Sequence, residues 1–348
     1  MRIAVDVMGG DHGCGVIVDG AGLALASNPQ ITELHLVGRE AEIRAALAHH
    51  RCHDPRVRVV HASEVLTMED KPVAGLRKKK DCSLLRAIDL VKHGQAEAVI
   101  STGNTGGLLA AATIRLRPLE GVERPAIATV IPSLEREFVL LDAGANAECK
   151  PLHLLQFAIM GSVYSREILG RERPRVGILC NGTEAHKGTE LTQEACKLCQ
   201  QADLNFIGHV EGHDLFADRV EVVVTDGFTG NIVLKTCESM GKAIVHLLKR
   251  ELMANPLRRA GALLAKAALR NIKRRMDPDA HGGAPLLGLN GNVVKAHGSA
   301  RELAIKNAIR VAGESVQHHI NEAICREVAL AGERPVASPT AAPLLHQA

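Results

Sequence analysis

Short polar turns rich in glycine recur along this chain, each between a hydrophobic run and a segment with helical character. The clearest turn reads Ser-Thr-Gly-Asn-Thr-Gly-Gly over residues 101–107 and follows the apolar run 98–100. Another reads Thr-Asp-Gly-Phe-Thr-Gly-Asn over residues 225–231 and follows the apolar run 222–224. A helix N-terminus offers unpaired N–H groups with a partial positive charge, and glycine lets an anion approach the backbone closely. The repeated turns therefore predict a protein that binds a small anion, phosphate above all.

The spacing of these turns also predicts the fold class. Short β-rich runs alternate with helical runs along almost the whole chain, which indicates an α/β protein with parallel strands joined by helical crossovers. In open sheets of this class, ligands bind beyond the carboxyl ends of the strands. With 348 residues, 46% of them hydrophobic, the chain can bury a large core. We expect one α/β domain over residues 1–332 and a flexible tail, rich in Pro and Ala, over residues 333–348.

Composition argues against several other classes. No run approaches the roughly 20 apolar residues of a membrane-spanning helix, and the start of the chain turns acidic at Asp6, too early for a secretory signal. These features predict a cytoplasmic protein. The nine cysteines include one C-x-x-C pair, Cys196 and Cys199, but no second Cys pair or nearby His pair supports a zinc site, and neither a Walker loop nor a dinucleotide fingerprint is present. We therefore expect neither a metal nor a cofactor. With 2% aromatic residues and no Trp, the chain is poorly supplied for stacking on nucleic acid.

Two turns near the N-terminal half carry the first candidate site residues. Asp6 and Asp11 flank a Gly-Gly pair, where they can hold a hydroxyl, an amine or a metal; alternatively, Asp11 caps the next helix. In the turn 101–107, the backbone N–H groups around Gly103 and Gly106 can cradle a phosphate or the developing oxyanion of a carbonyl. The side chains that can add to this cradle are Asn104 and Thr105.

Three later segments add polar side chains. Asp142 and Asn146 lie in a turn after a hydrophobic run, where they either orient a ligand or brace the neighbouring loop. Lys187 lies between small residues in the turn 181–188, where its charge can neutralise a phosphate. His297 precedes Gly298-Ser299 at a helix start and is a candidate general acid/base or anion donor.

Positive charge is concentrated in one segment. Residues 249–276 hold nine Lys or Arg against one acid, Glu251, whereas the formal net charge of the whole chain is only +3. On a helical wheel five of the basic residues share one face, opposite an apolar face that includes Leu257, Leu264 and Ile272. The five are Arg259, Lys266, Arg270, Lys273 and Arg274. Such a helix is typical of contact with a membrane surface or an acidic partner; the alternative is a surface helix whose apolar stripe packs on the core.

Taken in order, these motifs resemble the bacterial phosphate acyltransferases of phospholipid synthesis, which make acyl phosphate from acyl carrier protein thioesters. The matching segments are residues 6–11, 77–81, 101–107, 142–146, 187–188, 211–214, 225–231, 282–288 and 297–298. The resemblance implies a three-layer α/β/α sandwich with a mostly parallel sheet, similar to the isocitrate/isopropylmalate dehydrogenase fold. It also implies a homodimer that contacts the inner face of the cell membrane peripherally. Its substrates would be acyl carrier protein and inorganic phosphate, and a downstream glycerol-3-phosphate acyltransferase would use the product.

The resemblance also assigns roles to residues. Lys187, His297 and Asn104 would be catalytic. The phosphate and substrate contacts would come from Asp6, Asp11, Gly103, Thr105, Gly106, Asp142, Asn146, Glu211, Asp226 and Asn231. Lys78, Lys79 and the basic segment would receive the acidic carrier protein, the membrane surface or both.

Two other functions fit some of these features. A short-chain phosphotransacetylase that uses acyl-CoA shares the chemistry, and a non-catalytic membrane-associated scaffold shares the basic helix. A dehydrogenase of the same fold is a weaker alternative, since a dinucleotide fingerprint is missing. Residues 282–288 read as an apolar, Gly-hinged loop that lines a channel for a hydrocarbon chain or acts as a lid, which favours a long-chain substrate.

Overall fold

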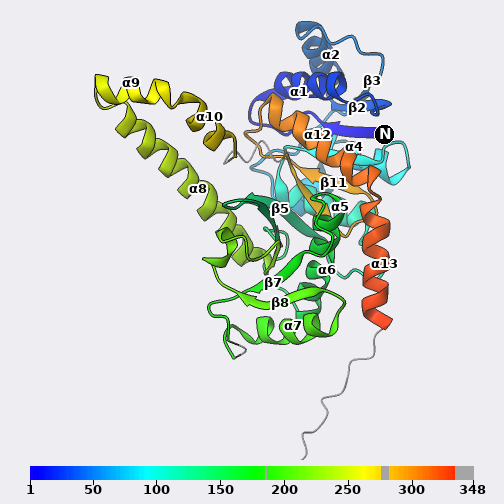
Figure 1. The fold of residues 1–348 in the computed structure, drawn as a ribbon. Helices are drawn as coiled ribbons and strands as arrows, with labels where there is room; N and C mark the ends of the chain where they lie inside the picture. The colour runs from blue at the N-terminus through cyan, green and yellow to red at the C-terminus, as the bar shows by residue number, and fades with distance from the viewer. Residues whose placement is uncertain (185, 276–281, 334–348) are drawn as a thin grey trace, which may run out of the picture.

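In the computed structural model, which describes residues 1–184, 186–275 and 282–333, the chain forms an eleven-stranded sheet with helices on both faces (Figure 1). The strands are β1 (Arg2–Asp6), β2 (Glu33–Gly38), β3 (Val57–His61), β4 (Ala98–Ser101), β5 (Ala126–Pro132), β6 (Glu137–Leu141), β7 (Arg175–Leu179), β8 (Asn205–Val210), β9 (Val222–Val224), β10 (Ala284–Leu287) and β11 (Asn292–Lys295). The helices are α1 (Gly13–Ser27), α2 (Glu40–His49), α3 (Pro72–Lys78), α4 (Ser83–Lys92), α5 (Thr105–Leu116), α6 (Pro151–Glu167), α7 (Glu190–Gln201), η1 (Asp214–Phe216), α8 (Gly227–Leu252), α9 (Pro256–Leu264), α10 (Lys266–Arg275), α12 (Glu302–Gln317) and α13 (Ile320–Glu333).

The sheet consists of two parallel blocks that run in opposite directions. Its strand order is β3-β2-β1-β4-β11-β10-β5-β6-β9-β7-β8. Strands β1 to β4 and β11 are mutually parallel, and so are β6, β9, β7 and β8. Between the blocks, β10 pairs antiparallel with both β11 and β5, and β5 pairs antiparallel with β6. The carboxyl ends of the two blocks therefore point to opposite ends of the sheet, so the turns that follow them do not all gather at one place.

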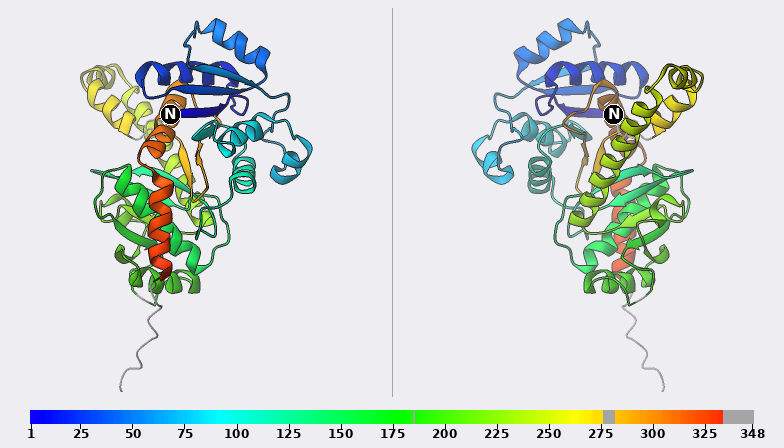
Figure 2. Two further views of the ribbon diagram at one scale, coloured as in Figure 1. Left: turned by 90° about the vertical axis from the view of Figure 1, so that its right-hand side faces the viewer. Right: turned by 90° about the vertical axis from the view of Figure 1, so that its left-hand side faces the viewer.

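Helices cover both faces of this sheet, which makes the three-layer α/β/α sandwich predicted from the sequence (Figure 2). On one face, α1 and α12 pack over the first block and α6, α7 and α13 over the second. On the other face, α4 and α5 cover the first block, and the start of α8 packs at the second. Side chains within a strand alternate between the two faces of the sheet. Val99 belongs to the core cluster on one face, and its neighbour Ile100 belongs to a cluster on the opposite face.

The segment 282–288 differs from its expected form as a loop. Its residues 284–287 are β10, a central strand with neighbours on both sides. A glycine is needed at position 283 because the neighbouring strand β11 comes close. A Cβ on Gly283 would lie 2.7 Å from the Lys295 carbonyl oxygen and 2.5 Å from a methyl carbon of Val294. Gly and Pro are depleted in strands, so the local composition indicates a loop, whereas pairing with two neighbouring strands makes it part of the sheet.

Helices α8, α9 and α10 form an arm that projects from the sheet (Figure 1). The basic segment does not form one helix: it is divided among the end of α8, α9, which ends at Leu264, and α10, which begins at Lys266. Leu257 and Leu264 on α9 are 84% and 91% exposed, so the apolar face of this helix is not packed on the core. None of the helices in the described part of the chain combines the length and apolar character that a membrane crossing requires.

Candidate active site

A cavity of about 1160 Å³ lies between α8, the strand β5 and the turns that follow β1, β4 and β11. These three strands are neighbours in the parallel block, so their carboxyl ends meet at one edge of the sheet. The turns contact one another directly: the Asp11 N–H donates to the Gly298 carbonyl at 2.9 Å. A Cβ on Gly9 would lie only 2.5 Å from the Cα of Gly103, so the close approach of the first two turns requires glycine.

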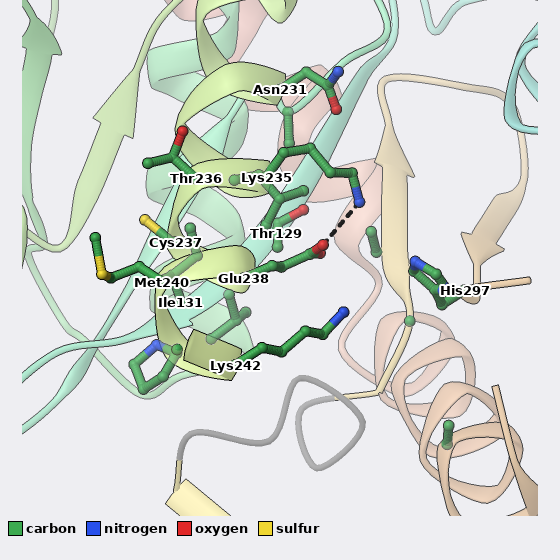
Figure 3. A pocket seen from close by; sticks show the side chains of 18 of the residues that line it. Thr129, Ile131, Asn231, Lys235, Thr236, Cys237, Glu238, Met240, Lys242 and His297 are labelled. Atoms are coloured by element: carbon green, nitrogen blue, oxygen red, sulfur yellow. Dashed lines mark hydrogen bonds and ion pairs between the residues drawn. The ribbon is translucent and has the colours of Figure 1, made fainter. Parts of the chain in front are cut away.

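One end of the cavity is polar and the rest is mainly apolar. The polar end includes Asp11, Thr105, Asn231, Lys235, Lys295 and His297. The apolar part includes Ile127, Ile131, Leu134, Phe216, Leu234, Met240 and Ile244. Strand β5 supplies one wall, and α8 supplies the facing wall (Figure 3).

Lys295, the last residue of β11, is the most unusual charged group at the polar end. Its Nζ donates to the carbonyl of Thr102 at 3.1 Å and to the carbonyl of Ala296. Burial lowers the pKa of Lys295 to about 8, although the carboxylates of Asp11 and Asp6 act in the opposite direction. The charge of Lys235 across the cavity adds to the lowering.

His297 lies at the exposed rim, where Ser299 fixes its hydrogen-bonding state. The Ser299 backbone N–H donates to His297 Nδ1 at 3.2 Å, and the Ser299 hydroxyl lies 2.8 Å from the same atom. Because a backbone N–H can only donate, Nδ1 is the acceptor, and the neutral ring carries its hydrogen on Nε2. His297 can therefore offer an N–H donor through Nε2.

Helix α8 presents a polar row to the same cavity. Asn231, Lys235 and Glu238 are spaced four and three residues apart, so they share one face of the helix (Figure 3). Lys235 Nζ lies 2.9 Å from Glu238 Oε2, which pairs this lysine within its own helix. From β5, Thr129 adds a hydroxyl that has no hydrogen-bond partner in the described structure.

Two predicted residues near the cavity use their side chains internally. Asn104 caps α5 by accepting from the Gly107 N–H at 2.9 Å, and its Nδ2 donates to the Met68 and Asp70 carbonyls at 3.3 Å each. Asp6 is buried and accepts from the Ser101 hydroxyl at 2.8 Å; burial raises the pKa of Asp6. These side chains hold the turns in place beneath the cavity.

Asp142 and Asn146 are hydrogen-bonded to each other in the turn that follows β6. The Asp142 carboxylate accepts from the backbone N–H groups of Ile127, Gly144, Ala145 and Asn146, at 2.7–3.2 Å, and from the Asn146 side chain at 2.9 Å. Burial raises the pKa of Asp142 despite these donors. Of the two alternatives that the sequence left open, this geometry favours bracing of the loop.

Asp226 and its glycines fix the start of α8 against that loop. Asp226 caps the helix by accepting from the Thr229 N–H and hydroxyl, both at 2.8 Å. A Cβ on Gly230 would overlap the Asp142 carbonyl oxygen at 1.9 Å, so the helix packs against the loop without room for a side chain. Asn231, one residue further, faces the cavity.

Other predicted contacts lie away from the cavity. Lys187 and Glu211 follow β7 and β8, the two strands at the far edge of the second block, and neither lines the cavity. Lys79 forms an ion pair with Asp70 at 2.5 Å, whereas Lys78 is exposed at the end of α3. The structure thus brings together Asp11, Thr105, Asn231 and His297, with Gly103 and Gly106 in the adjoining turn, and separates them from Lys187 and Glu211.

The sequence reasoning missed Lys235, Glu238 and Lys295. Lys295 lies two residues before His297, in a polar run that follows the apolar pair at 293–294, so recognition of β11 would have predicted it at a strand end. Within residues 1–184, 186–275 and 282–333, no group of three or more His, Cys, Asp or Glu side chains is arranged to hold a metal ion.

The architecture belongs to a class with solved representatives. A phosphotransacetylase from Streptococcus pyogenes has the same fold, with a TM-score of 0.62 and 16% identity over 91% of this chain and 94% of that chain. A 4-hydroxythreonine-4-phosphate dehydrogenase from Klebsiella pneumoniae is also similar, with a TM-score of 0.51 and 14% identity over 92% and 99% of the two chains. At such identities the likeness shows the fold alone, and it confirms the predicted fold class.

Sequence comparison identifies the family within this class. The model of the family described as fatty acid synthesis protein matches residues 1–323. A phosphate acyltransferase of Akkermansia muciniphila is 45% identical over 341 residues, 96% of this chain and 98% of the relative. A phosphate acyltransferase of Desulfitobacterium hafniense is 48% identical over 330 residues, 94% and 98% of the two chains. The chain belongs to this fatty acid synthesis family, as its motifs predicted.

Proposed function

We infer that this chain transfers a fatty acyl group from the thioester of acyl carrier protein to inorganic phosphate, which gives acyl phosphate. Family membership supports this reaction, since relatives that match almost the whole chain are phosphate acyltransferases. The structural observation that carries it is a cavity with Lys295 and His297 at one end and apolar side chains along the rest. Such a cavity suits a substrate whose polar reacting end is joined to a hydrocarbon chain.

The chemistry requires positioning more than a covalent intermediate. An oxygen of hydrogen phosphate attacks the thioester carbon, and the carbonyl electron pair moves onto the carbonyl oxygen. The oxyanion then re-forms the carbonyl as the C–S bond breaks, sulfur leaves with the bonding pair, and the proton lost by hydrogen phosphate balances the proton that the thiolate gains. Because phosphate is itself a nucleophile, orientation and stabilisation of the oxyanion can supply the catalysis. We assign oxyanion stabilisation to His297 Nε2–H, and Thr105 at the start of α5 lines the same cavity.

The apolar part of the cavity supports a long acyl chain over an acetyl group. Ile127, Ile131 and Leu134 come from the β5 side, while Leu234 and Met240 face them from α8. An acetyl group would leave this apolar lining exposed to water, whereas a long acyl chain would bury it. This lining favours the long-chain reaction over the phosphotransacetylase alternative.

The remaining site assignments stand on the motif match. For Lys187, Asn104 and Glu211 the motif match is the support, since Lys187 and Glu211 lie outside the cavity lining and the Asn104 side chain caps α5. Asp142, Asn146 and Asp226 contribute by holding the loop and helix next to the cavity. Asp11 and Asn231 line the polar end and are our candidates for substrate contact.

We also propose a peripheral position at the inner face of the cell membrane, a homodimer, and delivery of acyl phosphate to a glycerol-3-phosphate acyltransferase. The exposed Leu257 and Leu264, with basic residues on α9 and α10, support contact with an anionic lipid surface. Co-sedimentation with vesicles of anionic phospholipid tests this contact. Leu264→Glu should abolish it, and Leu303→Glu, at an exposed position on α12, should not; equal sedimentation of the two variants would contradict it.

The decisive experiment is turnover of the purified chain with palmitoyl carrier protein and inorganic phosphate. Hydroxylamine trapping detects acyl phosphate, and omission of phosphate is the control. Phosphate-dependent product is the expected result, and acetyl-CoA should be a poor substitute. Absence of product from folded protein would favour the scaffold, and faster turnover of acetyl-CoA would favour the short-chain enzyme.

A further inference from the structure

The ammonium group of Lys295 has a hydrogen-bond donor that the protein does not use. A lysine ammonium carries three N–H donors. Lys295 donates two of them to the carbonyls of Thr102 and Ala296, which are its hydrogen-bond partners within the described chain. The side chain lines the cavity, so the third N–H is free for a ligand there.

The charge of Lys295 is also incompletely compensated. Asp6 and Asp11 are near enough to act on its titration, yet no carboxylate in the described residues lies within ion-pair distance of its Nζ. Asp6 is engaged by the Ser101 hydroxyl, and the facing Lys235 is paired with Glu238. Because a partly buried cation without a paired anion is costly, the site is electrostatically prepared for an anionic ligand.

The surroundings of this ammonium suit a tetrahedral oxyanion. Thr105 begins α5, whose N-terminus offers backbone N–H groups, and it lines the same end of the cavity. A lysine ammonium and helix N–H groups together match an ion with several acceptor oxygens.

We propose that Lys295 binds the inorganic phosphate that accepts the acyl group. The inference rests on the proposed function and assigns to Lys295 the neutralising charge that the motif pattern assigns to Lys187. Lys295 makes a charged hydrogen bond to one phosphate oxygen, which leaves another oxygen to attack the thioester carbon. Its two carbonyl contacts hold the ammonium in place before phosphate enters.

Binding of phosphate without acyl substrate tests this inference independently of turnover. Inorganic phosphate should raise the melting temperature of the wild-type chain above that in sodium chloride of equal ionic strength, because a ligand that binds the folded state stabilises it. Lys295→Met should lose this shift. Lys306→Met, at a half-buried lysine on α12 outside the cavity, should retain it.

Steady-state kinetics then separate phosphate binding from acyl binding. Lys295→Met should raise KM for phosphate roughly 30-fold, in the range expected for loss of a charged hydrogen bond, with KM for palmitoyl carrier protein nearly unchanged. Lys295→Arg retains the charge and should recover part of the phosphate affinity. If phosphate protects Lys295→Met as well as wild type and KM for phosphate stays within about twofold, the proposal is overturned.

The pH dependence supplies a further readout. The pKa of Lys295 is lowered to about 8, so the charged fraction falls as pH rises through that value and phosphate KM should rise with it. Lys295→Arg stays charged, so its phosphate KM should not rise in this range. The titratable groups around the ammonium are Asp6 and Asp11 from the turn after β1, Lys235 and Glu238 from α8, and His297 on its own segment. A wild type without turnover but with phosphate protection lost in Lys295→Met would contradict the proposed function while retaining the phosphate site.

Discussion

The turn after β6 and the turn after β11 both carry a charged residue at a strand end, yet they use it in different ways. Asp142, after β6, accepts five hydrogen-bonding groups from the protein, and four of them are backbone N–H groups. Lys295, at the end of β11, makes two hydrogen bonds and faces a cavity. The first group is saturated by its own loop, whereas the second has capacity for a ligand.

This difference shows how a polar turn becomes structural or functional. A buried carboxylate is stable when N–H donors surround it, and those donors then have nothing left for a substrate. A partly buried ammonium that is held by carbonyls keeps a donor and an uncompensated charge. Two turns of similar polarity therefore provide a brace in one half of the sheet and a candidate binding site in the other.

The largest expected effect comes from breaking the saturated turn. Asp142→Ala would leave several buried N–H groups without an acceptor, and we expect it to lower the free energy of unfolding by about 3–5 kcal/mol. Asp142→Asn keeps one carbonyl oxygen but replaces the other acceptor by a donor, so it should lower the free energy of unfolding by less. Urea unfolding measures both values. A loss below about 1 kcal/mol for Asp142→Ala would mean that the loop does not depend on this carboxylate.

The next effect concerns the cavity turn itself. His297→Ala removes the Nε2–H donor, and we expect kcat to fall roughly 100-fold with little change in melting temperature, because the ring lies at the exposed rim. Ser299→Ala loses the hydroxyl but retains the backbone N–H that fixes the ring, so its loss should be a few-fold. His53→Ala, at an exposed position outside the cavity, is the matched control. Equal kcat for His297→Ala and the control would remove His297 from the mechanism.

Much of the fold could be predicted because the signals are local. The run at 98–100 and the polar turn after it became β4 and the start of α5, as the alternation of strands and helices indicated. The place of β10 and β11 between β4 and β5 in the sheet could not be predicted. Each is a four-residue strand, and β10 contains Pro285 and follows Gly283, a composition typical of loops.

The site could be predicted where the position of a residue along the chain also determines the direction in which its side chain points. Thr105 and Asn231 lie in or beside helix starts, and both face the cavity. Asn104 lies in the same kind of polar turn, but its side chain caps α5 and donates a hydrogen bond to the Met68 carbonyl. Such internal use depends on contacts 36 residues apart along the chain, which periodicity and turn composition do not encode.

The smallest expected effect concerns Lys187, which lies in the turn after β7 and is not among the residues that line the cavity. Its backbone N–H donates to the Glu184 carbonyl at 3.0 Å, and its side chain is not among the groups that line the cavity. We therefore expect Lys187→Ala to change kcat/KM less than about threefold, far below the loss for Lys295→Met, because a charge outside the cavity is screened from the reacting groups. Measuring both variants at the same phosphate concentrations makes the comparison direct. A loss in Lys187→Ala as large as in Lys295→Met would mean that the turn after β7 reaches the substrate during turnover.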